Sequence, residues 1–404
     1  MEIKEPERLT PVVGEADVIV VGSGPGGLSA AIAAARAGVS VILIERFGCF
    51  GGNITSVGVE GFAWYRHEKT IEAGGLAFEY EQRAIESNAA VPESQSKSYE
   101  LDSEGFKVVA DNLVLKAGVR PMLHRAFCAP ILDGDEIKGV ITESKAGREA
   151  IIGKIIIDAT GDADVARRSG VKVFKNKKED MISASVMFHM SGVNKEEFMN
   201  EIERDPQKYS DWSDKNWQVQ TSGKEDDMFS PFLRKPFEKA KDSGLIDSDL
   251  QTISGTWGAI HDTGELTYLN LVHLNGIDGT DPESLTKGEI EGRKAALEAI
   301  AALKEYMPGC SAGKLRNFGM TIGIRDTYKI DSVYNLSDED VKNECRFEDS
   351  VGIYPEFIDG FGGTVTGQGA GVAAAETIKN KTSLNSVNIS NVQKLLSNQN
   401  VRVF

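Results

Sequence analysis

Cysteine is scarce in this sequence. The four cysteines lie far apart in the chain: Cys49, Cys128, Cys310 and Cys345. No two of them form a CxxC pair, which argues against an iron–sulfur cluster, a zinc site or a disulfide framework. We therefore expect no metal site, and unpaired thiols fit a reducing compartment such as the cytoplasm. The charged N-terminal segment has no apolar core, so no signal peptide is expected.

Long apolar runs and excess basic charge are also lacking. No stretch of about 18 apolar residues occurs, so no membrane span is expected. The formal net charge is −16, whereas binding to nucleic acid or to an anionic membrane requires a basic surface. The sequence therefore favours neither partner. A chain of 404 residues is long enough for two or three structural units.

One motif dominates the first 50 residues. The stretch VIVVGSGPGGLSAAIAAARAGVSVILIERFG (Val18–Gly48) predicts a strand, a tight turn, a helix and a second strand. Gly22, Gly24 and Gly27 fit the pattern GxGxxG, in which the glycines permit the turn, the approach of a pyrophosphate and close helix–strand packing. The helix N-terminus would face the phosphates. Glu45 ends the second strand and is expected to accept hydrogen bonds from an adenosine ribose.

This fingerprint alone leaves NAD and FAD open. A Gly-rich segment, RFGCFGGN, follows Glu45 where an NAD domain would normally start its next helix. Later, IDATGDADVA (Ile157–Ala166) predicts a strand that ends in Gly161 and Asp162 at the start of another helix. A second loop near phosphate or ribose indicates a larger, extended cofactor, which favours FAD.

The pattern of elements predicts an α/β fold: a Rossmann-like FAD-binding domain with an inserted α+β substrate domain. Helices are expected over residues 75–87, 106–118 and 283–307, and a β-meander over residues 120–162. The predicted boundaries are an N-terminal tail (1–15), the first part of the FAD-binding domain (16–172), the insertion (173–308) and the return to the first domain (309–404).

Several segments together resemble a known family. GSGPGGLSAAIAAARAG, ERFGCFGGNITSVGV, ESKAGREAIIGKIIIDATGDADVA and GQGAGVAAA are similar to FAD-dependent oxidoreductases of the glutathione-reductase fold, in a fumarate-reductase-like flavoprotein branch. The resemblance covers nearly the whole chain. Its motifs are specific for FAD and say almost nothing about the substrate.

The resemblance implies a set of cofactor-binding residues. The pyrophosphate would be held by Gly22, Ser23, Gly24, Gly26 and Gly27, and the adenine ribose by Glu45. The part of the cofactor toward the flavin would be lined by Arg46, Gly51, Gly52 and Asn53, and the adenine would face Ala126 and Phe127. The pyrophosphate and ribitol would also lie near Gly161 and Asp162, and a helix that begins at the flavin would contain Gly369 and Gly371.

The sequence departs from the family pattern near Gly362. In the family, several tens of residues separate the EFIDG segment from TVTGQGAG and supply a final strand that ends in a Gly-Arg pair beside FAD. Here EFIDGFG (Glu356–Gly362) runs almost directly into GTVTGQGAG. We therefore expect an internal loss that leaves the ADP half of the cofactor site intact and removes a wall from the flavin half.

Three residues are candidates for catalysis. Arg325 could bind a substrate carboxylate through two parallel hydrogen bonds from its guanidinium group, or it could pair with Asp326. His261 and His273 could transfer protons, or they could be structural histidines. The resulting hypothesis is an FAD-dependent oxidoreductase that transfers a hydride between flavin and a small organic substrate, with a carboxylate as one candidate class. No second complete GxGxxG occurs, so the electron donor or acceptor stays unidentified.

Two alternatives remain open. The short join at Gly362 favours a non-catalytic or cofactor-impaired remnant that acts as a binding protein. An NAD-dependent dehydrogenase is disfavoured by the IDATGDADVA segment.

Overall fold

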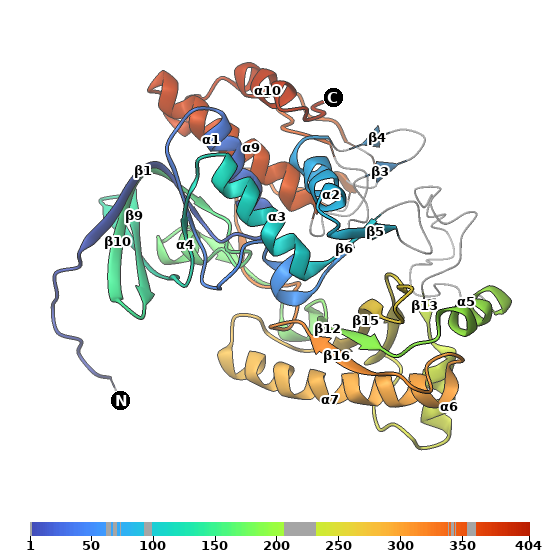
Figure 1. The fold of residues 1–404 in the computed structure, drawn as a ribbon. Helices are drawn as coiled ribbons and strands as arrows, with labels where there is room; N and C mark the ends of the chain where they lie inside the picture. The colour runs from blue at the N-terminus through green and yellow to red at the C-terminus, as the bar shows by residue number, and fades with distance from the viewer. Residues whose placement is uncertain are drawn as a thin grey trace.

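The computed structural model describes residues 2–61, 66–67, 71–72, 74–92, 99–205, 232–337, 339–340, 343, 345–353 and 361–404. Two larger sheets organise these residues, and the figure shows them in separate parts of the molecule (Figure 1). Three two-stranded ribbons accompany them: β3 (Arg66–His67) with β4 (Ile71–Glu72), β5 (Ala90–Pro92) with β6 (Tyr99–Leu101), and β11 (Val173–Phe174) with β17 (Lys329–Ile330).

The first sheet has six strands in the order β7-β2-β1-β10-β9-β8. Their bounds are β1 (Val12–Val21), β2 (Val41–Ile44), β7 (Arg120–Met122), β8 (Ala126–Asp133), β9 (Glu136–Ser144) and β10 (Gly147–Asp158). The pairs formed by β1 with β2, β1 with β10 and β2 with β7 are parallel, whereas β8, β9 and β10 form an antiparallel meander. This parallel part confirms the predicted α/β class.

Helices cover one face of this sheet. They are α1 (Pro25–Arg36), α2 (Leu76–Glu86), α3 (Ser103–Lys116), α9 (Phe361–Asn380) and α10 (Ile389–Asn398). Val18, Val20 and Leu43 point toward these helices and join their core, while Ile19 and Ile42 point to the opposite face, near α4 (Asp164–Arg168). A strand alternates its side chains between faces, so both faces of β1 are buried in apolar cores.

Small residues bring α1 and α9 together. A side chain added at Gly367 would lie 2.1 Å from the carbonyl oxygen of Gly26, and one added at Gly371 would lie 2.2 Å from the carbonyl oxygen of Ala30. The two helices therefore meet backbone to backbone. This contact joins the C-terminal segment from α9 onward, residues 361–404, to the first helix (Figure 1).

The second sheet, called the cap sheet below, has five strands in the order β13-β14-β15-β12-β16. Their bounds are β12 (Ala184–Ser191), β13 (Phe232–Leu233), β14 (Ile253–Thr256), β15 (Leu266–Leu274) and β16 (Lys314–Phe318); the accompanying helices are α5 (Lys195–Arg204), α6 (Lys235–Asp242) and α7 (Pro282–Tyr306). The pairings are all antiparallel. The long helix α7 was predicted from its apolar spacing, and it packs on this sheet.

The insertion extends further along the chain than predicted. The sequence-based boundary at residue 308 assigns residues 314–318 to the returning segment. In the structure, β16 pairs with β12, His189 standing opposite Asn317, so these residues belong to the cap sheet. Pairing between strands more than 120 residues apart leaves no local signal, which explains the difference.

The C-terminal half of β10 has one open edge. Strand β9 pairs with β10 only from Gly147 to Ile152, whereas β1 pairs with it as far as Asp158. Within the described residues, no strand covers the other edge of β10 from Gly153 onward. Ile155, Ile156 and Ile157 are accordingly half-buried, although their apolar run predicted burial on both faces. The predicted short join at Gly362–Gly363 falls in the first turn of α9. Residues 354–360, which precede it, lie outside the described part.

No helix among the described residues is both long enough and apolar enough to cross a bilayer.

Candidate functional site

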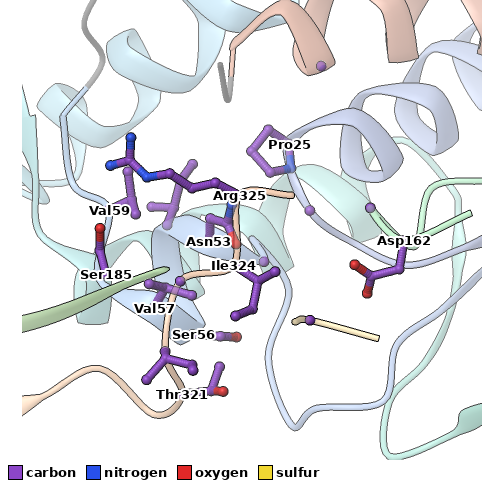
Figure 2. A pocket seen from close by; sticks show the side chains of 18 of the residues that line it. Pro25, Asn53, Ser56, Val57, Val59, Asp162, Ser185, Thr321, Ile324 and Arg325 are labelled. Carbon is purple, nitrogen blue, oxygen red and sulfur yellow. The ribbon is translucent and has the colours of Figure 1, made fainter. Parts of the chain in front are cut away.

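A cavity of about 1810 Å³ lies between the six-stranded sheet and the cap sheet. Ligand pockets usually have volumes of roughly 300–1,000 Å³, so this space is large enough for a dinucleotide together with a second molecule. One end is formed by the glycine loop after β1, and the other by β14, β15 and β12 of the cap sheet. Figure 2 shows Pro25 and Asp162 on one side of this space and Ser185 on the other.

The glycine loop (Gly22–Gly27) has the geometry that a pyrophosphate requires. A Cβ at Gly24 would meet no atom within 4 Å, so the backbone there is open to a ligand. By contrast, a Cβ at Gly22 would lie 2.3 Å from the carbonyl oxygen of Ala159, and one at Gly27 would lie 2.0 Å from the carbonyl oxygen of Gly22. Gly22 and Gly27 thus serve the fold, and Gly24 leaves room above the N-terminus of α1.

Glu45 connects this loop to the end of β2. Its Oε2 accepts hydrogen bonds from the backbone N–H and the hydroxyl of Ser23, at 3.0 and 2.6 Å, and its Oε1 accepts one from the backbone N–H of Phe47 at 2.9 Å. The residue is only 6% exposed. Both Ser23 and Glu45 line the cavity, so these hydrogen bonds fix the loop at the cavity edge.

A second loop is fixed by Asp158 at the end of β10. Its carboxylate accepts hydrogen bonds from the N–H and the hydroxyl of Thr160, at 3.1 and 2.7 Å, and from the N–H of Ala166 at 2.9 Å. The loop presents Gly161 and Asp162 to the cavity. Burial, together with the nearby carboxylate of Asp164, raises the pKa of Asp162, partly offset by a hydrogen bond from Thr327.

A π-helical turn, Asn53–Val57, forms the wall between the two ends of the cavity. Such turns often occur at functional sites. Its start is held against the glycine loop, because the N–H of Gly51 donates to the carbonyl oxygen of Ser23 at 2.9 Å and a Cβ at Gly52 would lie 2.4 Å from Cα of Gly24. Figure 2 shows Asn53, Ser56 and Val57 around this part of the cavity.

The segment Gly319–Arg325, called the Arg325 loop below, closes the cavity from the cap side. Gly323 exchanges two backbone hydrogen bonds with Ser185 on β12, at 2.8 and 2.9 Å. On α7, Oε1 of Glu289 accepts from the hydroxyl of Thr321 at 2.8 Å and from the N–H of Ile322 at 2.9 Å. The loop therefore holds Arg325 at the cavity, and the Arg325 side chain is exposed there.

Most of the predicted cofactor residues come together around this cavity. Those that line it are Gly22, Ser23, Gly24, Gly26, Glu45, Arg46, Gly52, Asn53, Ala126, Phe127, Gly161 and Asp162. Gly27 and Gly51 lie just behind this lining, where they support the glycine loop.

The two glycines predicted in the helix beside the flavin do not line the cavity. A Cβ at Gly369 would meet the Val351 side chain at 2.6 Å, and one at Gly371 would meet the Ala30 backbone. Both residues are needed for helix packing. The α9 residues that do line the cavity are Gly363, Thr366, Gly367 and Ala370, which lie on another side of the helix.

The predicted catalytic histidines separate into two groups. His273 lines the cavity beside Gly255, where a Cβ would lie 3.0 Å from its Nε2. His261 lies in a turn outside the cavity lining, with Nε2 3.2 Å from the hydroxyl of Thr267. Of these two histidines, His273 is the one that lines the cavity.

Sequence reasoning did not identify the cap-sheet residues that line the cavity. These include Ser185, Thr256, Tyr268 and Asn270. The alternation of Leu269, Asn270 and Leu271 was an available signal, because Leu269 and Leu271 are buried in the cap core while Asn270 faces the cavity. Among the described residues, no group of three or more His, Cys, Asp or Glu side chains is placed to hold a metal ion.

The residues of the first half of the cavity fit an FAD molecule. Gly24 leaves open backbone at a helix N-terminus, Glu45 and Asp162 offer acceptors to hydroxyl groups, and the lining continues past the π-helical turn toward the cap sheet. When bound, FAD supplies the capacity to accept or donate a hydride.

Solved structures with similar folds have low sequence identity to this chain. A geranylgeranyl bacteriochlorophyll reductase-like protein from Thermoplasma acidophilum superposes with a TM-score of 0.50 at 14% identity, over 96% of this chain and 84% of that one. An aromatic hydroxylase from angucycline biosynthesis superposes with a TM-score of 0.51 at 12% identity, over 95% of this chain and 68% of that one. These similarities concern the fold alone.

Curated relatives match only part of the chain. Thiamine thiazole synthase of Saccharolobus islandicus is 30% identical over 171 residues, 39% of this chain and 60% of that protein. Digeranylgeranylglycerophospholipid reductase 2 of Methanopyrus kandleri is 30% identical over 192 residues, 45% of this chain and 46% of that protein. The chain thus spans about half the length of these relatives.

A family model covers far more of the sequence. The model described as FAD dependent oxidoreductase matches residues 17–359. This range contains the glycine loop, the loop after β10 that Asp158 fixes, the cap sheet and the Arg325 loop. The chain belongs to the FAD-dependent oxidoreductase family.

Proposed function

We propose that this chain transfers a hydride between FAD and a small organic carboxylate, with Arg325 as the residue that binds the carboxylate. The observation that carries this proposal is the position of the Arg325 loop. It lies between the π-helical turn and the cap sheet, so a molecule held by Arg325 lies beside the part of the cavity assigned to the flavin.

The chemistry of the side chain supports the same role. A guanidinium group donates two parallel hydrogen bonds to a carboxylate, which fixes its orientation as well as its charge. Contacts to three backbone positions hold the loop just before Arg325: Glu289 binds Ile322, Ser185 binds Gly323, and the N–H of Thr321 donates to the carbonyl oxygen of Ser56 at 3.2 Å. His273 lies on the same side of the cavity and is the candidate for proton transfer.

The names of the relatives point to other chemistry, the synthesis of a thiazole and the reduction of a digeranylgeranylglycerophospholipid. We do not carry these over, because each match spans 60% or less of the relative.

The test is a titration of the FAD-loaded protein with succinate, followed by the change in flavin absorbance. We expect saturable binding, and we expect Arg325→Lys to weaken it by about tenfold or more, because lysine lacks the planar two-donor fork. Arg316→Lys, an exposed arginine of β16 outside the cavity lining, is the matched control. Equal affinities for wild type and Arg325→Lys would remove the arginine from the site.

A further inference from the structure

The cap sheet has two chemically different faces. Val186, Phe188 and Met190 of β12 point into the apolar core under α7, as do Leu269 and Leu271 of β15. The residues between them point the other way, and on β12 these include Ser185 and Met187, which line the cavity. Side chains alternate along the regular stretches of these strands, and an irregular step in the pairing of β12 with β15 lets both Asn270 and His273 reach the cavity.

The cavity face is polar in its centre. Thr256 of β14 stands opposite Asn270 of β15, and Ser185 of β12 stands opposite His273 of β15. All four line the cavity. Cross-strand partners lie within about 5.5 Å of each other, and the two pairs adjoin at Gly255, where a Cβ would lie 2.0 Å from the carbonyl oxygen of Asn270 and 3.0 Å from Nε2 of His273. The four residues are called the polar floor below.

Two members of the polar floor lack hydrogen-bond partners. The hydroxyl of Ser185 and the Oδ1 atom of Asn270 are buried, and neither has a partner in the described part of the chain. Ser185 as a whole is only 3% exposed. A buried polar atom without a partner is costly, by roughly 1–3 kcal/mol, and such atoms are rare unless something else satisfies them.

The polar floor is close to the proposed carboxylate anchor. Ser185 is hydrogen-bonded through its backbone to Gly323, two residues before Arg325. Figure 2 shows Ser185 and Arg325 on the same side of the cavity, away from Asp162. A substrate carboxylate at Arg325 would therefore place the rest of the molecule over the polar floor.

We infer that the substrate is a carboxylic acid that carries a hydroxyl group, which the polar floor recognises through Asn270 and Ser185. This rests on the proposed function, because Arg325 supplies the carboxylate end. An apolar chain over the floor would leave both buried atoms unsatisfied, whereas a hydroxyl group can donate to Asn270 Oδ1 and exchange a hydrogen bond with Ser185.

Four compounds separate the two halves of this inference. L-malate and succinate differ by one hydroxyl group, and malamide and succinamide repeat that difference without charge. Binding to the FAD-loaded protein is measured by calorimetry. We expect malate to bind about 5- to 150-fold more tightly than succinate, the range that one unsatisfied buried group produces, and malamide to exceed succinamide by a similar factor.

The variants assign each difference to a residue. Asn270→Leu should reduce the malate-to-succinate ratio to about 1, mainly by weakening malate, and Ser185→Ala should reduce it in part. Asn317→Leu, on exposed strand β16 of the same sheet, is the matched control and should keep the ratio. Arg325→Lys should weaken both acids equally and leave both amides unchanged.

The outcomes distinguish the inference from the proposed function. If malate and succinate bind with equal affinity and both require Arg325, the recognition of a hydroxyl group by the polar floor is wrong, whereas the binding of a carboxylate by Arg325 is retained. A different result would support the polar floor and overturn the role of Arg325: malamide binds more tightly than succinamide, this difference requires Asn270, and the affinities of the two acids do not change in Arg325→Lys. No binding of any of the four compounds at millimolar concentration would overturn both.

Discussion

The hydroxyl of Ser23 donates a hydrogen bond of 2.6 Å to Oε2 of Glu45, and the backbone N–H of the same serine donates to the same oxygen at 3.0 Å. With the bond from Phe47 to Oε1, three of the roughly four acceptor positions of the carboxylate are used by the protein. Glu45 therefore has a role in the loop as well as the proposed role at the ribose, with one acceptor position left for a ribose hydroxyl.

We expect Glu45→Ala to weaken FAD binding by roughly 10- to 150-fold, since hydrogen bonds to a charged group contribute about 1.5–3 kcal/mol. The measurement is a fluorescence titration of apoprotein with FAD. Ser23→Ala removes one hydroxyl and keeps the backbone bond, so it should have a smaller effect. An unchanged FAD affinity in Glu45→Ala would rule out the assignment.

Gly24 and Gly27 provide a matched pair of substitutions. Gly24→Val adds a side chain into open space at an extended backbone position (φ −60°, ψ 178°), so the apoprotein should fold normally and lose FAD binding. Gly27→Ala places a Cβ 2.0 Å from a carbonyl oxygen and should lower the melting temperature of the apoprotein. The placement of the pyrophosphate is wrong if Gly24→Val retains full flavin occupancy.

The contrast between Gly24 and Gly371 explains how much could be predicted from sequence. The glycine loop is local: one strand, one turn and one helix specify it, so the spacing of Gly22, Gly24 and Gly27 was sufficient. In GQGAG the same residue type serves another purpose, because Gly371 meets Ala30 more than 300 residues away. Glycine spacing alone does not distinguish a loop around phosphate from close contact between helices.

The cap sheet illustrates a second limit. Its strands are short, its register contains irregular steps, and its pairing joins distant parts of the chain. The polar floor depends on that register, since a shift of one residue would exchange Asn270 with Leu269 or Leu271. The composition of the site could therefore not be read from any single segment.

Glu289 is expected to be a positioning residue for the Arg325 loop. Its Oε1 holds Thr321 and Ile322, while Oε2 pairs with Arg293 at 2.7 Å. Glu289→Ala should weaken succinate binding by about 5- to 30-fold, because losing an acceptor for a partly buried N–H and hydroxyl costs about 1–2 kcal/mol. FAD affinity should not change.

Arg293→Ala is the control for this prediction. It removes the exposed i,i+4 ion pair from the other oxygen of Glu289 and should leave succinate binding nearly unchanged. If Glu289→Ala and Arg293→Ala behave alike, the loop does not depend on Glu289.

Asp17 gives the protein an acid-sensitive contribution to stability. The ammonium group of Lys154, together with the N–H and hydroxyl of Ser40, lowers the pKa of Asp17 to about 2. A lowered pKa in the folded state means that the stabilisation is complete above the unfolded value of about 4 and is lost as the pH falls toward 2. The effect is modest, because Lys154 is largely exposed and water screens the pair.

We therefore expect Asp17→Asn to be less stable than wild type at neutral pH, and the difference to shrink as the pH falls from about 4 to 2. Urea unfolding at several pH values measures it. Lys154→Met should retain part of the pH dependence, because the bonds from Ser40 remain. A difference that is the same at every pH would contradict the role of the charged carboxylate.

The short join near Gly362 should weaken FAD binding without destroying the fold. The glycine loop and Glu45 retain their contacts in the ADP half of the site, but within the described residues no strand covers the edge of β10 from Gly153 to Asp158. Ile155 and Ile157 are half-buried there, and an open strand edge favours aggregation. We expect low flavin occupancy after purification, partly restored by added FAD.

Inserting a family-like segment after Gly362 should raise flavin occupancy and increase the melting temperature by a few degrees, because covering two half-buried isoleucines contributes about 2 kcal/mol. A Gly/Ser insertion of equal length at the same point is the control and should do neither. Stoichiometric, tightly bound FAD in the 404-residue chain would show that the flavin half of the site is complete without that segment.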